Sequence, residues 1–187
     1  MLTVISGGAD SGKSSFAEDI VCKSSCSKRY YIATMKAVDE AAGARIKKHR
    51  RMRDGKGFVT LEIPIDINEA VSMMDDPADS VALLECVSNL VANMMYDDSA
   101  AASLCRSDKA GEVEFAKLAV SKVTDLAASV KDLVVVISIY PPKPEDDDDT
   151  RLYKRLLNLV NIKLSDLADN TYIMNSISGS DSGSYRE

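Results

Sequence analysis

A glycine-rich segment near the N-terminus fits the pattern G-x-x-x-x-G-K-[ST] and consists of Gly7, Gly8, Ala9, Asp10, Ser11, Gly12, Lys13 and Ser14. In loops of this pattern, glycines let successive backbone N–H groups point at phosphate oxygens, and the following helix adds its positive N-terminal end. Lys13 would supply a positive charge to the β and γ phosphates, and Ser14 a hydroxyl ligand for Mg²⁺. The alternative interpretation is a glycine turn followed by an incidental Lys-Ser pair.

A carboxylate suited to hold the metal partner of such a loop stands at Glu85. It ends the apolar run of residues 81–84, which is typical of a parallel strand buried on both faces. A parallel strand delivers its last residues to the crevice at the carboxyl edge of the sheet, where ligands bind. Glu85 is therefore a second candidate ligand for Mg²⁺, with a helix cap or a surface carboxylate as the alternative.

Cations crowd into one short stretch that also contains His49, the single histidine of the chain: Arg45, Lys47, Lys48, Arg50, Arg51, Arg53 and Lys56. This cluster has three interpretations: a solvated helix face, a nucleic-acid patch or a site for the phosphates of a nucleotide. No aromatic residues interleave with the cations, which argues against nucleic acid. A neutral imidazole can attack an α-phosphorus, with neighbouring cations stabilising the charge on the phosphoryl oxygens. A purely structural or surface role for His49 is the alternative.

The elements that must position these residues follow from hydrophobic periodicity, because short apolar runs alternate with helical stripes. Strands are expected at residues 2–6, 30–34, 58–63, 81–86, 133–139 and 171–174. Helices are expected after Lys13 and at residues 39–52, 68–74, 113–130 and 152–167. Such alternation predicts an α/β fold, with a mostly parallel sheet and helices on both faces.

The composition agrees with a single globular domain. The chain has 187 residues, of which 45% are hydrophobic and 28% charged, with a formal net charge of −6. We expect one domain over residues 1–175 and a flexible Ser- and Gly-rich tail over residues 176–187. Residues 140–149 contain three prolines and an acidic run and are expected to form an exposed, mobile loop.

No apolar run approaches the roughly 18 residues that a membrane helix needs. The acidic balance argues against nucleic acid as the main partner. The N-terminus lacks the features of a signal peptide, so we expect a cytoplasmic protein with reduced cysteines and no membrane span.

The sequence resembles the bifunctional adenosylcobinamide kinase/adenosylcobinamide-phosphate guanylyltransferases of cobalamin biosynthesis. The resemblance is carried by the glycine-rich loop, Tyr31-Ile32-Ala33-Thr34, the Arg-Ile-x-x-His segment from Arg45 to His49 with Arg50 and Arg53, Glu62 with Pro64, and Leu83-Leu84-Glu85-Cys86 with Asn93. Order and spacing agree over roughly the first hundred residues. Beyond them the likeness is weaker, although residues 151–169 are similar to the last helix of the family.

The resemblance implies a recombinase-A-like P-loop NTPase fold and assembly as a homotrimer. It implies phosphorylation of adenosylcobinamide by ATP or GTP, with Mg²⁺, and then transfer of GMP from GTP through a guanylylated histidine. His49 stands at the position of that histidine, and Lys13 is the second expected catalytic residue. Besides the loop from Gly7 to Ser14, the resemblance implies nucleotide contacts from Ala33, Thr34, Met35, Arg50, Arg51, Met52, Arg53, Glu62 and Glu85.

The chain also departs from the family pattern. The family usually has Arg where Asp10 stands, Asn-Glu-Val-Gly where Ser138-Ile139-Tyr140-Pro141 stands, and Gly where Asn158 stands. These departures motivate two alternatives to the bifunctional transferase. One is a divergent P-loop nucleotide-binding protein without turnover, and the other is a small-molecule kinase with a changed acceptor.

Overall fold

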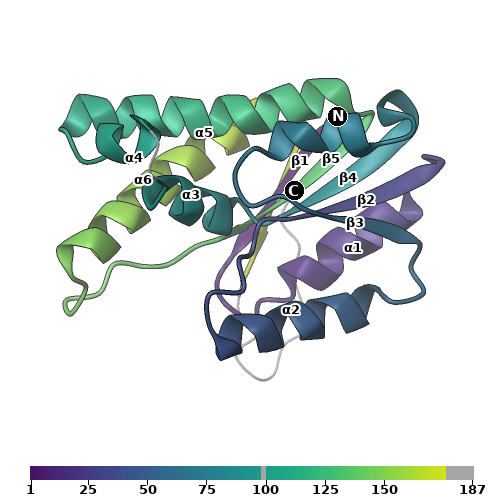
Figure 1. Cartoon of the computed structure of the whole chain (residues 1–187), viewed down its shortest axis with the longest axis horizontal. Coiled ribbons are helices and arrows are strands. Elements are labelled where there is room, and N and C mark those ends of the chain that lie inside the picture. The colour runs from purple at the N-terminus through teal and green to yellow at the C-terminus, as the bar shows by residue number, and fades with distance from the viewer. Residues whose placement is uncertain (98–99, 176–187) are drawn as a thin grey trace.

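The computed structural model describes residues 1–97 and 100–175, and its elements alternate along the chain as the sequence predicts (Figure 1). In order they are β1 (Leu2–Gly7), α1 (Lys13–Lys23), β2 (Lys28–Ala33), α2 (Glu40–Arg53), β3 (Phe58–Glu62), the 3₁₀ helices η1 (Ile67–Met73) and η2 (Pro77–Asp79), β4 (Ser80–Glu85), α3 (Val87–Met95), α4 (Ala100–Leu104), α5 (Lys109–Ser129), β5 (Asp132–Ser138), α6 (Asp148–Leu167) and β6 (Asn170–Met174).

The six strands form one sheet in the order β3-β2-β4-β5-β1-β6, and all neighbouring strands are parallel. The carboxyl ends of all the strands therefore meet at a single edge of the sheet. The register pairs Gly7 with Ser138 and Ala33 with both Glu62 and Glu85. This edge brings together the strand ends that the sequence analysis identified as candidate site positions.

Helices cover both faces of the sheet, and each face has its own apolar core. Alternate residues of β1 point to opposite faces, so that Val4 belongs to the larger core and Ile5 to the smaller one. The larger core lies under α3, α5 and α6, and the smaller one lies under α1, with α2 on the same side (Figure 1). The central strands β4 and β5 are buried on both faces, as their continuous apolar runs predict.

Four elements differ from the expectation. The helix expected at residues 68–74 is the 3₁₀ helix η1, and α3, α4 and η2 were not predicted. Helix α3 is apolar on most sides, with Val87, Leu90, Val91, Met94 and Met95 all buried. It follows β4 almost directly, and its apolar residues recur at helical spacing, so the sequence carried a signal for this helix that the prediction missed.

The prediction of a mobile loop at residues 140–149 was wrong for its acidic part. Asp148 and Asp149 form the first turn of α6, and the Asp147 side chain caps the helix by accepting a 2.7 Å hydrogen bond from the Thr150 backbone N–H. Acidic side chains are stabilising there because the helix N-terminus carries positive partial charge. Asp146 is held by an ion pair to Lys154 of the same helix. The run is mostly exposed, as predicted, but it forms the start of a helix rather than a mobile loop.

Within the described residues, no helix combines the length and the apolar character needed to cross a membrane. The predicted tail, residues 176–187, lies outside the part of the chain that the structure describes.

Candidate functional site

The glycine-rich loop joins β1 to α1 at the carboxyl edge of the sheet. Gly12 has a left-handed backbone with φ of 81° and is the N-cap residue that immediately precedes α1. Asp10 is also left-handed, with φ of 53°, and its side chain is exposed. A Cβ added at Gly7 would lie 2.5 Å from the carbonyl oxygen of Met174 in β6, so this position accepts only glycine without movement of the neighbouring strand.

Lys13 and Ser14, the first two residues of α1, reach back to neighbouring elements. The Lys13 amine is buried and donates a 2.6 Å hydrogen bond to the Gly8 carbonyl oxygen, which folds the side chain along the loop. Burial lowers the pKa of Lys13, and the carboxylates of Glu85 and Asp10 partly oppose this shift. Ser14 Oγ donates a 2.9 Å hydrogen bond to Glu85 Oε1 at the end of β4. The fold thus joins the two residues predicted as metal ligands.

The residues present fit a magnesium ion. Glu85 Oε2 is buried and has no hydrogen-bond partner among the described residues, although burying a carboxylate oxygen without a partner is costly. A hydroxyl and a carboxylate beside a phosphate-binding loop are the oxygen donors that Mg²⁺ takes when it binds nucleotide phosphates. Burial raises the pKa of Glu85 to about 7. The hydrogen bond from Ser14 and the charge of Lys13 lower this pKa, but their effect is smaller than that of burial.

Replacing Glu85 by glutamine is expected to stabilise the metal-free protein at high pH. The raised pKa means that the folded protein binds this proton more tightly than the unfolded chain, whose carboxyl has the ordinary value of 4.5. The contribution of Glu85 to stability is therefore full below about pH 4.5 and is lost as the pH rises through about 7. At pH 8, Glu85→Gln should raise the free energy of unfolding in urea by about 2 kcal/mol, with almost no gain at pH 4.5.

The matched control is Glu62→Gln, which changes an exposed carboxylate at the end of β3. It should alter the free energy of unfolding little at either pH, because surface substitutions of this kind are nearly neutral. A Glu85→Gln protein less stable than the parent at pH 8 would show that burial does not penalise this carboxylate.

His49 and the phosphate-binding loop line the same cavity, which has a volume of about 350 Å³. The loop lines it from Ala9 to Ser15, and α2 lines it with Arg45, Lys48, His49 and Met52. Glu85 and Met35 line it as well. Helix α2 is positioned by Asp39, whose side chain accepts a 2.6 Å hydrogen bond from Ala42 N–H and so caps the helix.

The environment of His49 suits a nucleophile. Burial lowers the pKa of the imidazole, and the nearby guanidinium of Arg53 lowers it further. A lowered pKa keeps the ring neutral near pH 7, which leaves a nitrogen lone pair free to attack. Nδ1 is buried without a hydrogen-bond partner among the described residues.

A second, smaller cavity of about 30 Å³ adjoins the first, since His49, Met35 and Glu85 line both. Ala33, Arg50, Arg53 and Glu62 also line it. Arg50 forms an ion pair with Glu62. Arg53 is buried, with its guanidinium 3.5 Å from the centre of the Tyr31 ring. A cation over an aromatic face is held in place, so this charge is fixed before a ligand binds.

Two of the residues for which the resemblance implies nucleotide contacts, Thr34 and Arg51, do not line the cavities of His49. The Thr34 hydroxyl is buried and bound to the backbone of Cys86: it donates to the carbonyl oxygen at 2.7 Å and accepts from the N–H at 2.8 Å. Its side chain therefore joins the ends of β2 and β4. Arg51 is exposed and lines neither of the two cavities that His49 lines.

The positions of the α2 cations predict unequal contributions to nucleotide binding. Arg45→Ala or Lys48→Ala should weaken GTP binding about 5- to 10-fold, because each removes a charge from the cavity that the phosphate-binding loop also lines. Arg51→Ala, the matched control on the same helix, should leave the Kd nearly unchanged. Isothermal titration at two salt concentrations checks this result, since screening should reduce the difference. Equal losses in all three variants would favour a general field of the helix over contacts in the cavity.

Several cavity residues were not among the predicted site residues. Arg45 and Lys48 were predicted only as members of the cationic cluster and of the resemblance segment. The i, i+3, i+4, i+7 spacing of Arg45, Lys48, His49 and Met52 is the signal that places them on one face of the helix. Asn89 on α3, Ser138 at the end of β5 and Tyr140 just after it come from segments distant in the sequence. No local pattern distinguishes them, because only the order of strands in the sheet brings them to the loop.

The fold and the site together define the chain as a P-loop nucleotide-binding protein. A solved structure described as a prototypical ATPase from the type III secretion system of pathogenic bacteria has the same fold, with a TM-score of 0.54 at 11% identity, and the match covers 92% of this chain and 50% of that one. Residues 3–180 match the model of the family described as cobinamide kinase / cobinamide phosphate guanyltransferase, so the chain belongs to that family.

Two curated relatives carry the name bifunctional adenosylcobalamin biosynthesis protein CobU. The protein of Escherichia coli (strain K12) is 37% identical over 97 residues, which is 52% of this chain and 51% of the relative. The protein of Salmonella typhimurium (strain LT2) is 31% identical over 96 residues, 51% of each chain. The chain thus spans about half the length of the curated relatives it matches.

Proposed function

We propose that this protein phosphorylates a hydroxyl of adenosylcobinamide and then transfers GMP from GTP to the phosphate that it has made. Family membership supports both reactions. The observation that carries the proposal is that His49 and the phosphate-binding loop line one cavity. A nucleoside triphosphate held by the loop would present its phosphates to the imidazole.

In the kinase step, the acceptor hydroxyl attacks the γ-phosphorus, the bond to the β–γ bridging oxygen breaks, and a nucleoside diphosphate leaves. Phosphoryl transfer of this kind needs mainly positioning and neutralisation of charge. The backbone N–H groups of the loop and the amine of Lys13 supply both. Either ATP or GTP fits this chemistry, and the proposal does not depend on which is used.

In the guanylyl step, the neutral imidazole of His49 attacks the α-phosphorus of GTP, and pyrophosphate leaves as the α–β bridging bond breaks. A phosphate oxygen of the acceptor then attacks the same phosphorus, the P–N bond breaks, and His49 is regenerated. Arg45 and Lys48 stabilise the charge on the phosphoryl oxygens, since both line the cavity beside His49. We propose that Gly7–Ser14, Ala33, Met35, Arg50, Met52, Arg53, Glu62 and Glu85 form the nucleotide site.

Mg²⁺ fits this proposal as a cofactor that would neutralise phosphate charge when bound. Ser14 and Glu85 are the residues that would hold it, because their oxygens adjoin the loop and Glu85 Oε2 has no protein partner among the described residues.

Incubation with cobinamide, GTP and Mg²⁺, followed by mass spectrometry of both the protein and the small molecules, tests the proposal. The expected result is protein carrying one acid-labile GMP, together with cobinamide phosphate and the GMP-linked product. Phosphorylated cobinamide without labelled protein would leave only a kinase. Tight GTP binding without any product would favour a nucleotide-binding protein without turnover.

We also propose, from the family resemblance, a cytoplasmic homotrimer. Sedimentation equilibrium should give about three times the chain mass of 20.2 kDa, and a monomer at the concentrations used for the assays would contradict it.

A further inference from the structure

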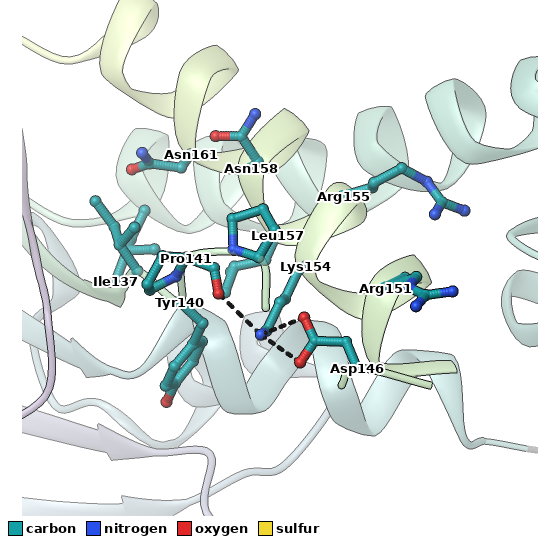
Figure 2. A pocket seen from close by; sticks show the side chains of 12 residues that line it. Ile137, Tyr140, Pro141, Asp146, Arg151, Lys154, Arg155, Leu157, Asn158 and Asn161 are labelled. Atoms are coloured by element: carbon teal, nitrogen blue, oxygen red, sulfur yellow. Dashed lines mark hydrogen bonds and ion pairs between the residues drawn. The ribbon is translucent and has the colours of Figure 1, made fainter. Parts of the chain in front are cut away.

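A third cavity, of about 410 Å³, lies between the carboxyl end of β5, the segment that follows it and helix α6 (Figure 2). Most of its exposed lining surface is apolar, with Ile137, Pro141 and Leu157 among the walls, although half of the lining residues are polar or charged, Arg151 and Arg155 among them. This combination is typical of small-molecule sites, in which apolar walls bind and a few polar groups orient. None of the reaction steps proposed above uses this cavity.

An ion pair holds the wall of the cavity in place. Lys154 Nζ donates hydrogen bonds to both carboxylate oxygens of Asp146, at 2.8 and 2.7 Å, and to the carbonyl oxygen of Pro141 at 2.9 Å (Figure 2). The side chains of Lys154 and Asp146 are only 12% and 7% exposed. The proline-containing segment is thereby fixed to α6, so the cavity is formed before a ligand binds.

Two amide side chains border the cavity from α6. Asn158 and Asn161 are three residues apart and therefore lie on the same face of the helix (Figure 2). Asn161 Oδ1 is buried and accepts no hydrogen bond from the described residues. Because an acceptor buried without a partner is costly, this oxygen indicates a ligand that donates an N–H or O–H.

The cavity adjoins the nucleotide site at Tyr140, which lines both. At the junction, Ile139 N–H donates a 2.8 Å hydrogen bond to the carbonyl oxygen of Gly7, the first residue of the phosphate-binding loop. A molecule held in the cavity therefore lies next to that loop, and an arm passing Tyr140 would enter the space where the phosphates are proposed to bind.

We propose that this cavity is the acceptor site, and that it binds one edge of an apolar macrocycle carrying primary amides. Asn161 accepts a hydrogen bond from an amide N–H of the ligand, the apolar walls contact the ring edge, and the hydroxyl-bearing arm extends past Tyr140. The inference rests on the proposed function, which supplies cobinamide as an acceptor of this chemistry. The volume of the cavity accommodates one edge of the macrocycle, with the rest of it outside.

The test measures cobinamide binding to the full chain by equilibrium dialysis, together with GTP binding and covalent labelling by GTP. Asn161→Leu keeps the shape of the side chain and removes its polar atoms. It should raise the Kd for cobinamide about tenfold, the usual effect of losing one buried hydrogen bond, while GTP binding and labelling are retained. The matched control is Asn68→Leu on η1, since Asn68 Oδ1 is likewise buried without a partner but lies outside this cavity.

A test on the ligand avoids any effect of mutation on folding. A cobinamide analogue with methyl esters in place of the primary amides cannot donate to Asn161, so the unaltered protein should bind it about tenfold more weakly than cobinamide. The Asn161→Leu protein should not distinguish the two ligands.

The outcomes separate the two proposals. If the unaltered protein binds cobinamide, and Asn161→Leu and the ester analogue both bind with unchanged Kd, the cavity is not the acceptor site and the proposed function stands. If Asn161→Leu alters the sedimentation coefficient but not the Kd, the cavity belongs to a contact between copies of the chain and our proposal is wrong. If the unaltered protein binds no cobinamide, both the proposed function and the proposed acceptor site are wrong.

Discussion

Replacing His49 by alanine is expected to abolish GMP transfer, with a loss of about 10⁴-fold or more, because removal of a nucleophile that forms a covalent intermediate eliminates the pathway itself. No acid-labile GMP should be found on the protein by mass spectrometry. Phosphorylation of cobinamide should persist, because the kinase step uses the loop and Lys13 rather than the imidazole. This division between the two reactions distinguishes a nucleophile from a residue that merely shapes the cavity.

The control for this prediction is Lys47→Ala, which changes an exposed residue two positions away on α2 and outside the cavity of His49. It should be labelled like the parent protein. A His49→Ala protein that still acquired covalent GMP would place the nucleophile elsewhere. Equal loss of both reactions would instead indicate a structural role.

The rate of labelling should also depend on pH in a defined direction. Because burial and Arg53 lower the pKa of His49 below 6.5, the imidazole stays neutral across neutral pH. The single-turnover labelling rate should therefore be flat above pH 7 and fall only below pH 6.5. A rate still rising between pH 7 and 8 would mean that a different group limits the reaction.

Replacing Lys13 by methionine is expected to reduce both reactions by about 10²- to 10³-fold, the usual cost of removing one donor aimed at developing phosphoryl charge. Methionine keeps the length and apolar character of the buried stem, and the hydrogen bond from Lys13 to Gly8 is the only described contact it removes within the loop. The loss should therefore appear in kcat and in GTP affinity, with little change in thermal stability.

Lys23→Met provides the matched control, since Lys23 is an exposed residue in the last turn of the same helix. Its kinetics should equal those of the parent protein. The two variants should differ in the reactions that they affect. Lys13→Met should reduce both phosphorylation and GMP transfer, whereas His49→Ala should remove GMP transfer alone. Full kinase activity in Lys13→Met would show that the loop does not hold the reacting phosphates.

Much of the molecule could be predicted from local patterns. Six strands were predicted within one or two residues of their ends, because continuous apolar runs and helical stripes report burial directly. The phosphate-binding loop and the position of Glu85 at the end of β4 also followed from residue types and spacing. The prediction that the acidic run of residues 145–149 is a mobile loop was wrong, because it rested on repulsion between like charges. In the structure, the positive end of α6 and the ion pair with Lys154 offset that repulsion.

Residue types and spacing therefore established the chemistry that is available: a loop for phosphates, a lone imidazole among cations, and a carboxylate for a metal. The three-dimensional fold was needed to show that these groups share one cavity, that Thr34 and Arg51 do not line it, and that residues after β5 form another cavity beside it. The physical reason is that β1 inserts between β5 and β6, so that Gly7 and Ser138 become neighbours although they are far apart in the sequence. Periodicity records how each segment is buried, but it carries no information about which strand ends meet.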